Sequence, residues 1–138
     1  MNYLQIHQNE IVFALIMFIF LFKNYFISKI YKIKMFNVKE LNNILSNNNE
    51  EDLLIDVRTP QEYSRGHIEK SKNIELRNIT EHIKSNLKKY DKKNIYLICQ
   101  SGSRSMNAAL NIKKLGIKNV YNIKGGMMRW HLNKLPIK

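Results

Sequence analysis

Short β-branched runs alternate with helical patterns along residues 35–138, and this alternation limits the fold more than any other feature of the chain. The clearest strand is Asn94–Ile98, and the clearest helix is expected over 103–115, with Gly116 as its end. Shorter strands are expected at 53–55, 72–76 and 119–123. Strand–helix alternation predicts an α/β domain with a central, mostly parallel sheet and helices on both faces. The length of 138 residues suits one such domain.

Two capping boxes mark the starts of helices. Asn37 is followed by Glu40, and Thr59 is followed by Glu62, with Pro60 at the first helical position. We therefore expect helices over about 38–45 and 60–64. Two further helices are predicted, over about 78–89 and from the paired glycines at 125–126 through residue 132.

Residues Ile11–Phe22 form an unbroken run of twelve apolar residues. As a helix this run is only about 18 Å long, short of the hydrocarbon layer of a membrane, which is about 30 Å thick. Extension past Lys23, whose ammonium group can reach the interface, predicts a single N-terminal transmembrane helix over residues 8–27. Residues 28–35 then form a basic juxtamembrane linker that can touch anionic lipid, and residues 36–138 form the α/β domain.

Three alternatives for the apolar segment fit less well. A cleaved signal peptide needs basic residues before the apolar run and small residues after it, and neither is present. A buried core helix this apolar needs a larger protein to cover it, and an interfacial helix needs a polar face. Because Lys and Arg follow the run and none precedes it, we expect a single-pass protein of the cell membrane with its C-terminal domain in the cytoplasm.

The formal net charge of the chain is +12. Such a balance is typical of proteins that bind nucleic acid, anionic membranes or anionic substrates, and also of a solvated, lysine-rich surface. Lys and Arg do not form a block with interleaved aromatic residues, so nucleic acid is not expected as a partner. Cys and His residues do not cluster at the spacing of metal ligands, and no metal site is expected.

Cys99 is the only cysteine, so an intrachain disulfide is impossible and the thiol is a candidate nucleophile. The commoner role of a lone cysteine is that of a small buried hydrophobe. Cys99, however, ends a predicted strand, and ligands of open α/β sheets bind beyond the carboxyl ends of strands. The N–H groups at the start of the following helix favour a thiolate and can hold an anion. The expected anion-binding loop consists of Gln100, Ser101, Gly102, Ser103, Arg104 and Ser105.

Two loop residues have specific expected roles. Gly102 allows the backbone to take a positive φ and to turn its amides inward. Arg104 supplies a fixed positive charge near the end of the loop.

Three motifs in order resemble the rhodanese-like family over roughly residues 36–136. The first is Leu54–Tyr63 with Gly66, His67 and Ile68, and the second is Cys99–Ser105. The third comprises Gly125, Gly126, Met127, Trp130, Leu135 and Pro136. The resemblance implies a rhodanese-like α/β fold.

The resemblance also implies sulfur transfer through Cys99. The thiolate would take the outer sulfur of a small anionic donor, either thiosulfate or a persulfide, and would hold it as a persulfide. A thiol, a protein or cyanide would then accept it. No cofactor is implied. Asp56, Arg58 and His67 are expected to brace the fold near the site instead of taking part in the chemistry.

Two other functions remain open from the sequence. A non-catalytic rhodanese-like interaction module is one, although the chain keeps the cysteine that such modules lack. A cysteine-dependent phosphatase or arsenate reductase is the other. Those enzymes carry five residues between the cysteine and an arginine, whereas four residues separate Cys99 from Arg104 here.

Overall fold

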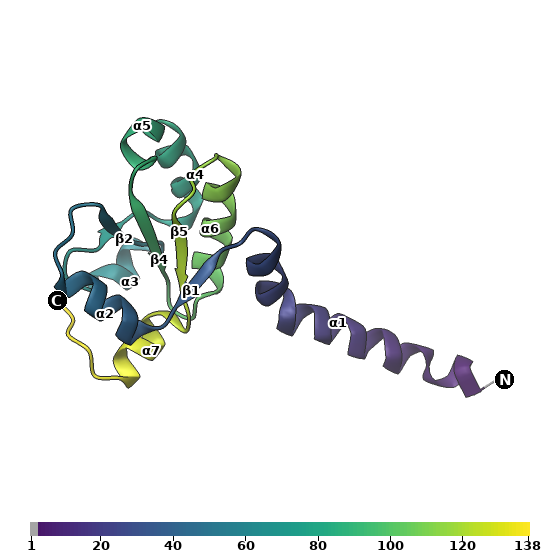
Figure 1. The fold of residues 1–138 in the computed structure, drawn as a ribbon. Coiled ribbons are helices and arrows are strands. Elements are labelled where there is room, and N and C mark those ends of the chain that lie inside the picture. The colour runs from purple at the N-terminus through teal and green to yellow at the C-terminus, as the bar shows by residue number, and fades with distance from the viewer. Residues whose placement is uncertain (1–2) are drawn as a thin grey trace.

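The computed structural model describes residues 3–138 (Figure 1). The strands are β1 (Lys34–Phe36), β2 (Asp52–Asp56), β3 (Lys72–Asn73), β4 (Asn94–Ile98) and β5 (Val120–Ile123). The helices are α1 (Tyr3–Ile30), α2 (Val38–Ser46), α3 (Pro60–Ser64), α4 (Leu76–Lys84), α5 (Leu87–Tyr90), α6 (Ser103–Lys114) and α7 (Gly126–Leu132).

The strands form one sheet in the order β1-β5-β4-β2-β3, and every neighbouring pair is parallel. β4 lies at the centre, and its residue Leu97 pairs with Ile55 of β2 and Asn122 of β5. The predicted parallel α/β architecture is therefore confirmed. Since the strands run the same way, the loops that follow β2, β4 and β5 meet at one edge of the sheet.

The pleat of β4 divides the core into two layers. Ile95 and Leu97 pack into one cluster with buried residues of α4 and α6, whereas Tyr96 and Ile98 pack into a second cluster with buried residues of α2 and α7. Alternate side chains of a strand point to opposite faces of a sheet. Helices therefore cover both faces, as the alternation of elements predicts (Figure 1).

Both predicted capping boxes form. The side chain of Asn37 accepts hydrogen bonds at the start of α2, and Glu40 bonds back to the N–H of Asn37. Thr59 and Glu62 make the same reciprocal pair at the start of α3. These boxes fix where each helix begins, and the second one places Glu62 beside the edge of the sheet where the site lies.

Three elements differ from the sequence-based expectation. The helix expected over 78–89 begins at Leu76 and breaks into α4 and α5 at Asn86, whose side-chain amide donates to the carbonyl of His82. Such local bonding competes with helix continuation. The strand expected at 72–76 is shortened to β3. β1 was not expected, because its three residues carry no periodic pattern, and pairing with β5 creates it.

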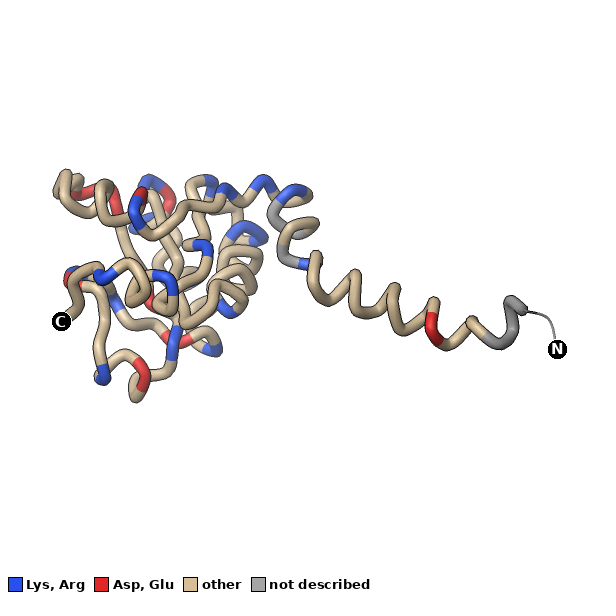
Figure 2. Tube along the Cα trace, turned by 90° about the horizontal axis from the view of Figure 1, so that it is seen from below, with Lys and Arg blue, Asp and Glu red and all other residues tan. Residues whose placement is uncertain are grey.

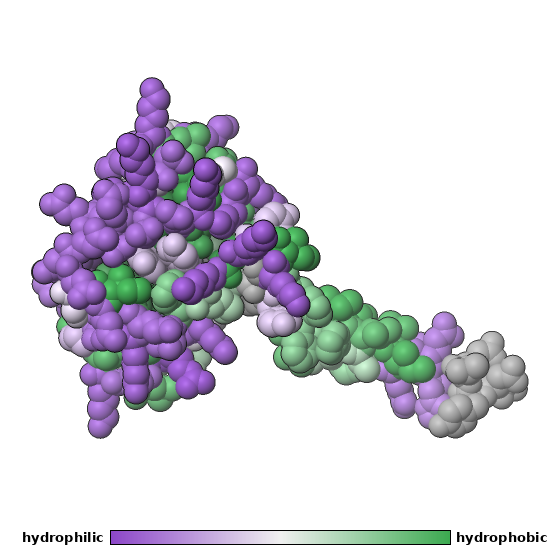
Figure 3. All heavy atoms as spheres, in the orientation of Figure 1, coloured by the Kyte–Doolittle hydropathy of each residue, from purple (hydrophilic) through white to green (hydrophobic). Residues whose placement is uncertain are grey.

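The expectation of a transmembrane helix over residues 8–27 is not supported. α1 carries exposed apolar side chains along Ile11–Phe22 (Figure 3). Within the described part of the chain, no helix combines the length and the apolar character that crossing a membrane requires. The physical reason is the short apolar run, about 18 Å along the helix axis, after which lysines follow toward the domain (Figure 2). The expected orientation and membrane contact stay untested predictions.

Substitution of Leu97 by Ala tests the role of β4 as the centre of the core. Leu97 is 0% exposed, and its truncation leaves a cavity between the sheet and α6, so the free energy of unfolding should fall by about 2–5 kcal/mol. Urea denaturation measures this loss. The control is Leu132→Ala at the end of α7, where the side chain is 71% exposed and the expected change is within about 0.5 kcal/mol. Equal losses for the two variants would contradict the assignment of the core.

Candidate active site

Cys99 follows the last residue of β4, and α6 begins four residues later at Ser103. The backbone N–H of Gly102 donates to Sγ of Cys99 at 3.1 Å, and the hydroxyl of Ser105 donates to the same sulfur at 3.4 Å. The residue is 0% exposed. The sulfur is thus buried, but one amide and one hydroxyl are directed at it, and both favour negative charge on it.

Gly102 takes a left-handed conformation, with φ +98°, directly before α6. A Cβ at this position would lie 3.3 Å from the backbone N of Gly125 and 3.3 Å from the carbonyl of Ile123. Both the positive φ and the close approach favour glycine. Gly102 has the positive φ that the sequence predicts, and its N–H is the group that contacts the sulfur.

The first turn of α7 holds the other side of the loop. The N–H of Met127 donates to the carbonyl of Cys99 at 2.8 Å, and the N–H of Met128 donates to the carbonyl of Gln100 at 3.0 Å. Gly126 has φ +55°, and a Cβ there would lie 2.3 Å from the carbonyl oxygen of Cys99. Helix N-termini carry unpaired N–H groups, and here the loop carbonyls satisfy two of them.

Asn122 is a site residue that the sequence reasoning missed. It lies on β5 with 1% exposure, and its side-chain amide donates to the carbonyl of Gly102 at 3.2 Å. Its Oδ1 is a buried polar atom without a hydrogen-bond partner among the described residues. A polar residue within an otherwise apolar strand was the available signal. Asn122 holds the Gly102–Ser103 peptide, which directly follows the peptide whose N–H contacts the sulfur.

Arg104 was expected to supply a fixed positive charge near the end of the loop, and in the structure this charge lies against Glu62. Its guanidinium donates to both carboxylate oxygens of Glu62, each at 2.7 Å. The bond to Arg104 is the main reason that the pKa of Glu62 falls from its ordinary value of 4.5 to about 2. The pKa of Arg104 rises, chiefly through the same bond. Arg104 therefore ties the loop to α3.

Asp56 and Arg58 form a buried ion pair, with 2.8 Å between Nη2 and Oδ2. Arg58 also donates to the carbonyl of Gly66 at 2.8 Å, so the pair ties the end of β2 to the loop after α3. His67 stacks on Tyr63, and its Nδ1 lies 3.0 Å from the carbonyl of the same residue. These contacts brace the backbone and bring none of the three side chains to the sulfur.

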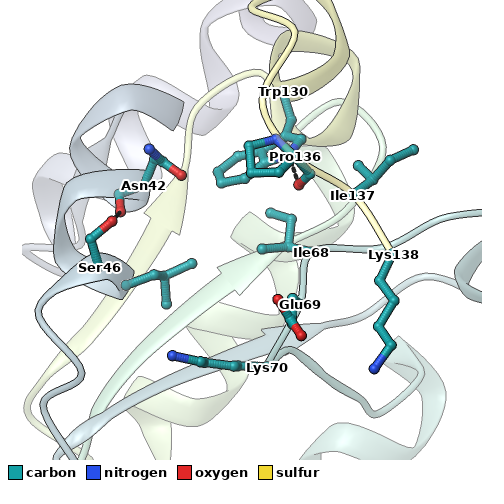
Figure 4. A pocket seen from close by; sticks show the side chains of 10 residues that line it. Asn42, Ser46, Ile68, Glu69, Lys70, Trp130, Pro136, Ile137 and Lys138 are labelled. Atoms are coloured by element: carbon teal, nitrogen blue, oxygen red, sulfur yellow. Dashed lines mark hydrogen bonds between the residues drawn. The ribbon is translucent and has the colours of Figure 1, made fainter.

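Gln100, Ser101 and Ser103 are exposed on the outer side of the loop. A shallow cleft of about 310 Å³ borders the loop at Gln100 and is lined by Arg58, Glu62, Arg65, Gly66, Gln100 and His131. A larger cavity, of about 360 Å³, lies elsewhere, between α2 and the residues after α7 (Figure 4). None of the loop residues lines that larger cavity, so the chemistry is expected at the smaller cleft.

Substitution of Gly126 by Ala tests whether α7 supports the loop. The added methyl group meets both a strained φ and the carbonyl of Cys99, so the free energy of unfolding should fall by about 2–4 kcal/mol in urea denaturation. Gly116→Ala is the matched control, because Gly116 also has a positive φ but no atom within 4 Å of the added Cβ, and the expected loss there is about 1–2 kcal/mol. If both variants lose the same amount, the packing of α7 on the loop is not significant for stability.

The Glu62–Arg104 pair predicts a pH dependence of stability. The pKa of Glu62 is lower in the folded chain, about 2, than its ordinary value of 4.5, so its contribution to stability is present above pH 4.5 and is lost as the pH falls toward 2. In urea unfolding, the difference in free energy of unfolding between the wild type and Glu62→Gln should shrink as the pH falls through this range. The control is Glu40→Gln, which alters a capping box without an arginine partner. A gap between wild type and Glu62→Gln that stays constant down to pH 2 would contradict the prediction.

The chain is similar in sequence to several curated proteins. The chain is 37% identical over 97 residues to the tRNA uridine(34) hydroxylase of Buchnera aphidicola, which covers 68% of this chain and 30% of that protein. It is 40% identical over 87 residues to the putative sulfurtransferase YtwF of Bacillus subtilis, covering 63% of this chain and 81% of that protein. The chain spans less than two thirds of the length of several of its curated relatives.

A solved structure shares the fold. The crystal structure of a rhodanese-like domain protein from Staphylococcus aureus superposes with a TM-score of 0.59 at 29% identity, over 71% of this chain and 91% of that one. The family model of the rhodanese-like domain matches residues 37–133, which include β2, the Cys99 loop and α7. The chain therefore belongs to the rhodanese-like domain family.

Proposed function

We propose that this protein is a sulfurtransferase that carries sulfur as a persulfide on Cys99. The observation that supports the proposal most directly is the contact of the Gly102 N–H and the Ser105 hydroxyl with Sγ. Preorganised donors of this kind stabilise the negative charge that a thiolate and a persulfide carry. Relatives named as sulfurtransferases give independent support for the general enzyme class.

The proposed reaction has two steps. The Cys99 thiolate attacks the outer sulfur of thiosulfate or of a persulfide, a new S–S bond forms, and the old S–S bond breaks with its electron pair leaving on sulfite or on the donor thiolate. An acceptor thiolate then attacks the outer sulfur of the Cys99 persulfide and restores the Cys99 thiolate. No net oxidation occurs, and no second cysteine exists in the chain to resolve the persulfide into a disulfide.

A phosphatase or arsenate reductase fits the site less well. Such enzymes need an arginine that faces a tetrahedral oxyanion above the cysteine. Arg104 is instead bound through both of its terminal nitrogens to Glu62, and the loop is one residue shorter than that chemistry uses.

A binding role without catalysis is the second candidate, and the burial of the thiol favours it. With 0% exposure, Cys99 reacts only when the residues around it shift. A module that only binds a partner does not need the sulfur, so its binding would survive removal of Cys99.

Mass spectrometry after incubation with thiosulfate, and separately with a small-molecule persulfide, tests the proposal. We expect the peptide that contains Cys99 to gain the mass of one sulfur atom, and cyanide or a thiol to remove it. Cys99→Ser is the control and should gain nothing. If Cys99 stays unmodified with both donors, sulfur transfer is excluded and the binding role takes its place.

A further inference from the structure

The cleft beside the Cys99 loop is larger than the proposed inorganic donor requires. Its volume of about 310 Å³ reaches the lower end of the range of small-molecule sites, about 300–1,000 Å³. Gln100, the residue after the nucleophile, forms part of its wall. A small organic molecule can therefore lie in the cleft with one end next to the loop.

Two of the charged side chains that line the cleft, Glu62 and Arg58, already form ion pairs within the protein. The carboxylate of Glu62 is bound at both oxygens by Arg104, and the guanidinium of Arg58 is bound by Asp56 and the carbonyl of Gly66. Neither pair is available to a ligand without breaking the contacts that hold the loop or the end of β2.

Arg65 differs from these paired groups. It lies directly after α3, its side chain is exposed, and no hydrogen bond or ion pair holds its guanidinium among the described residues. His131, in the last turn of α7, is also exposed and lines the same cleft. The uncompensated charge that faces the cleft is therefore positive, with an imidazole as a second donor or acceptor.

A carboxylate is the group that this arrangement suits. The fork of N–H groups on an arginine matches the two oxygens of a carboxylate, and a charged partner strengthens each bond. The proposed inorganic donor needs to reach only Sγ of Cys99, which the Gly102 N–H and the Ser105 hydroxyl contact. A ligand that also reaches Arg65 must carry its negative charge away from its reacting sulfur.

We propose that Arg65 and His131 bind the carboxylate of a small organic thiol that accepts sulfur from Cys99. The inference rests on the proposed sulfur transfer and names the acceptor class. With its carboxylate at Arg65, the acceptor thiolate attacks the outer sulfur of the Cys99 persulfide. The bond between Sγ and the outer sulfur breaks, its electron pair stays on Sγ, and the acceptor leaves as a persulfide.

Two acceptors of similar size test the proposal on the full-length chain. 3-Mercaptopropionate carries a carboxylate, whereas 2-mercaptoethanol carries a neutral hydroxyl. With thiosulfate as donor, Arg65→Gln should raise KM for 3-mercaptopropionate by about tenfold to a hundredfold, the loss expected for a charge-assisted hydrogen bond, and should leave kcat unchanged. The kinetics with 2-mercaptoethanol should not change. Arg65→Lys should restore part of the loss, and His131→Asn should raise the same KM by a smaller factor.

Arg77→Gln is the matched control, since Arg77 is an exposed arginine on α4 that does not line the cleft and forms an ion pair with Glu75. It should behave as wild type with both acceptors. A change that is equal for the two acceptors, or no change in Arg65→Gln, would overturn the proposed subsite while leaving sulfur transfer intact.

Calorimetry separates the two possible failures. The thioether 3-(methylthio)propionate keeps the carboxylate but cannot accept sulfur, and it should bind to wild type and lose affinity in Arg65→Gln. If it binds in this way while Cys99 never gains sulfur, the subsite stands and the sulfurtransferase proposal fails. If Cys99 gains sulfur but the thioether binds both variants equally, the subsite proposal fails alone.

Discussion

The hydrogen bond from the Gly102 amide to Sγ of Cys99 depends on support from three directions, and the rest of the site is organised around it. Asn122 holds the Gly102 carbonyl, and the first turn of α7 holds the carbonyls of Cys99 and Gln100. Arg104 ties the far end of the loop to Glu62. An amide in a loop keeps its direction only when the peptide on each side is fixed, and here β5, α7 and α3 fix it. The geometry of the site therefore depends on β5, α7 and α3 together, and not on the loop alone.

The sequence predicted the architecture well, because its signals are local. The apolar strand before Cys99, the two capping boxes and the glycine that ends α6 each depend on neighbouring residues, and the structure contains all of them. β1 could not be predicted, because it forms only by pairing with β5. Asn122 carried a local signal as a polar residue in an apolar strand, but its role follows only from its contact with Gly102. Both depend on residues that are far apart in the chain.

The candidate site was predictable in outline and not in detail. The position of Cys99 at the end of β4 and the turn at Gly102 follow from the order of elements. Arg104 and its partner Glu62 are 42 residues apart in the sequence, and no local pattern predicts that they pair. The same applies to the burial of Cys99, which packs with buried residues of α4 and α6 that are distant in the chain or lie on another element. The apolar run at 11–22 leads to the prediction of a membrane span over 8–27, which the structure does not support, because the run itself is too short.

The order in which the supporting elements occur along the chain has a consequence for biosynthesis. β1, the first strand of the sheet, pairs with β5, the last one, and α7 follows β5 directly. Cys99 and its loop leave the ribosome before β5 and α7 do, so the nascent chain carries an unsupported thiol until almost all of the domain has emerged. The pairing of β1 with β5 joins segments that are far apart in the chain, and contacts of such long sequence separation slow folding. The reactive geometry is thus among the last features of the molecule to form.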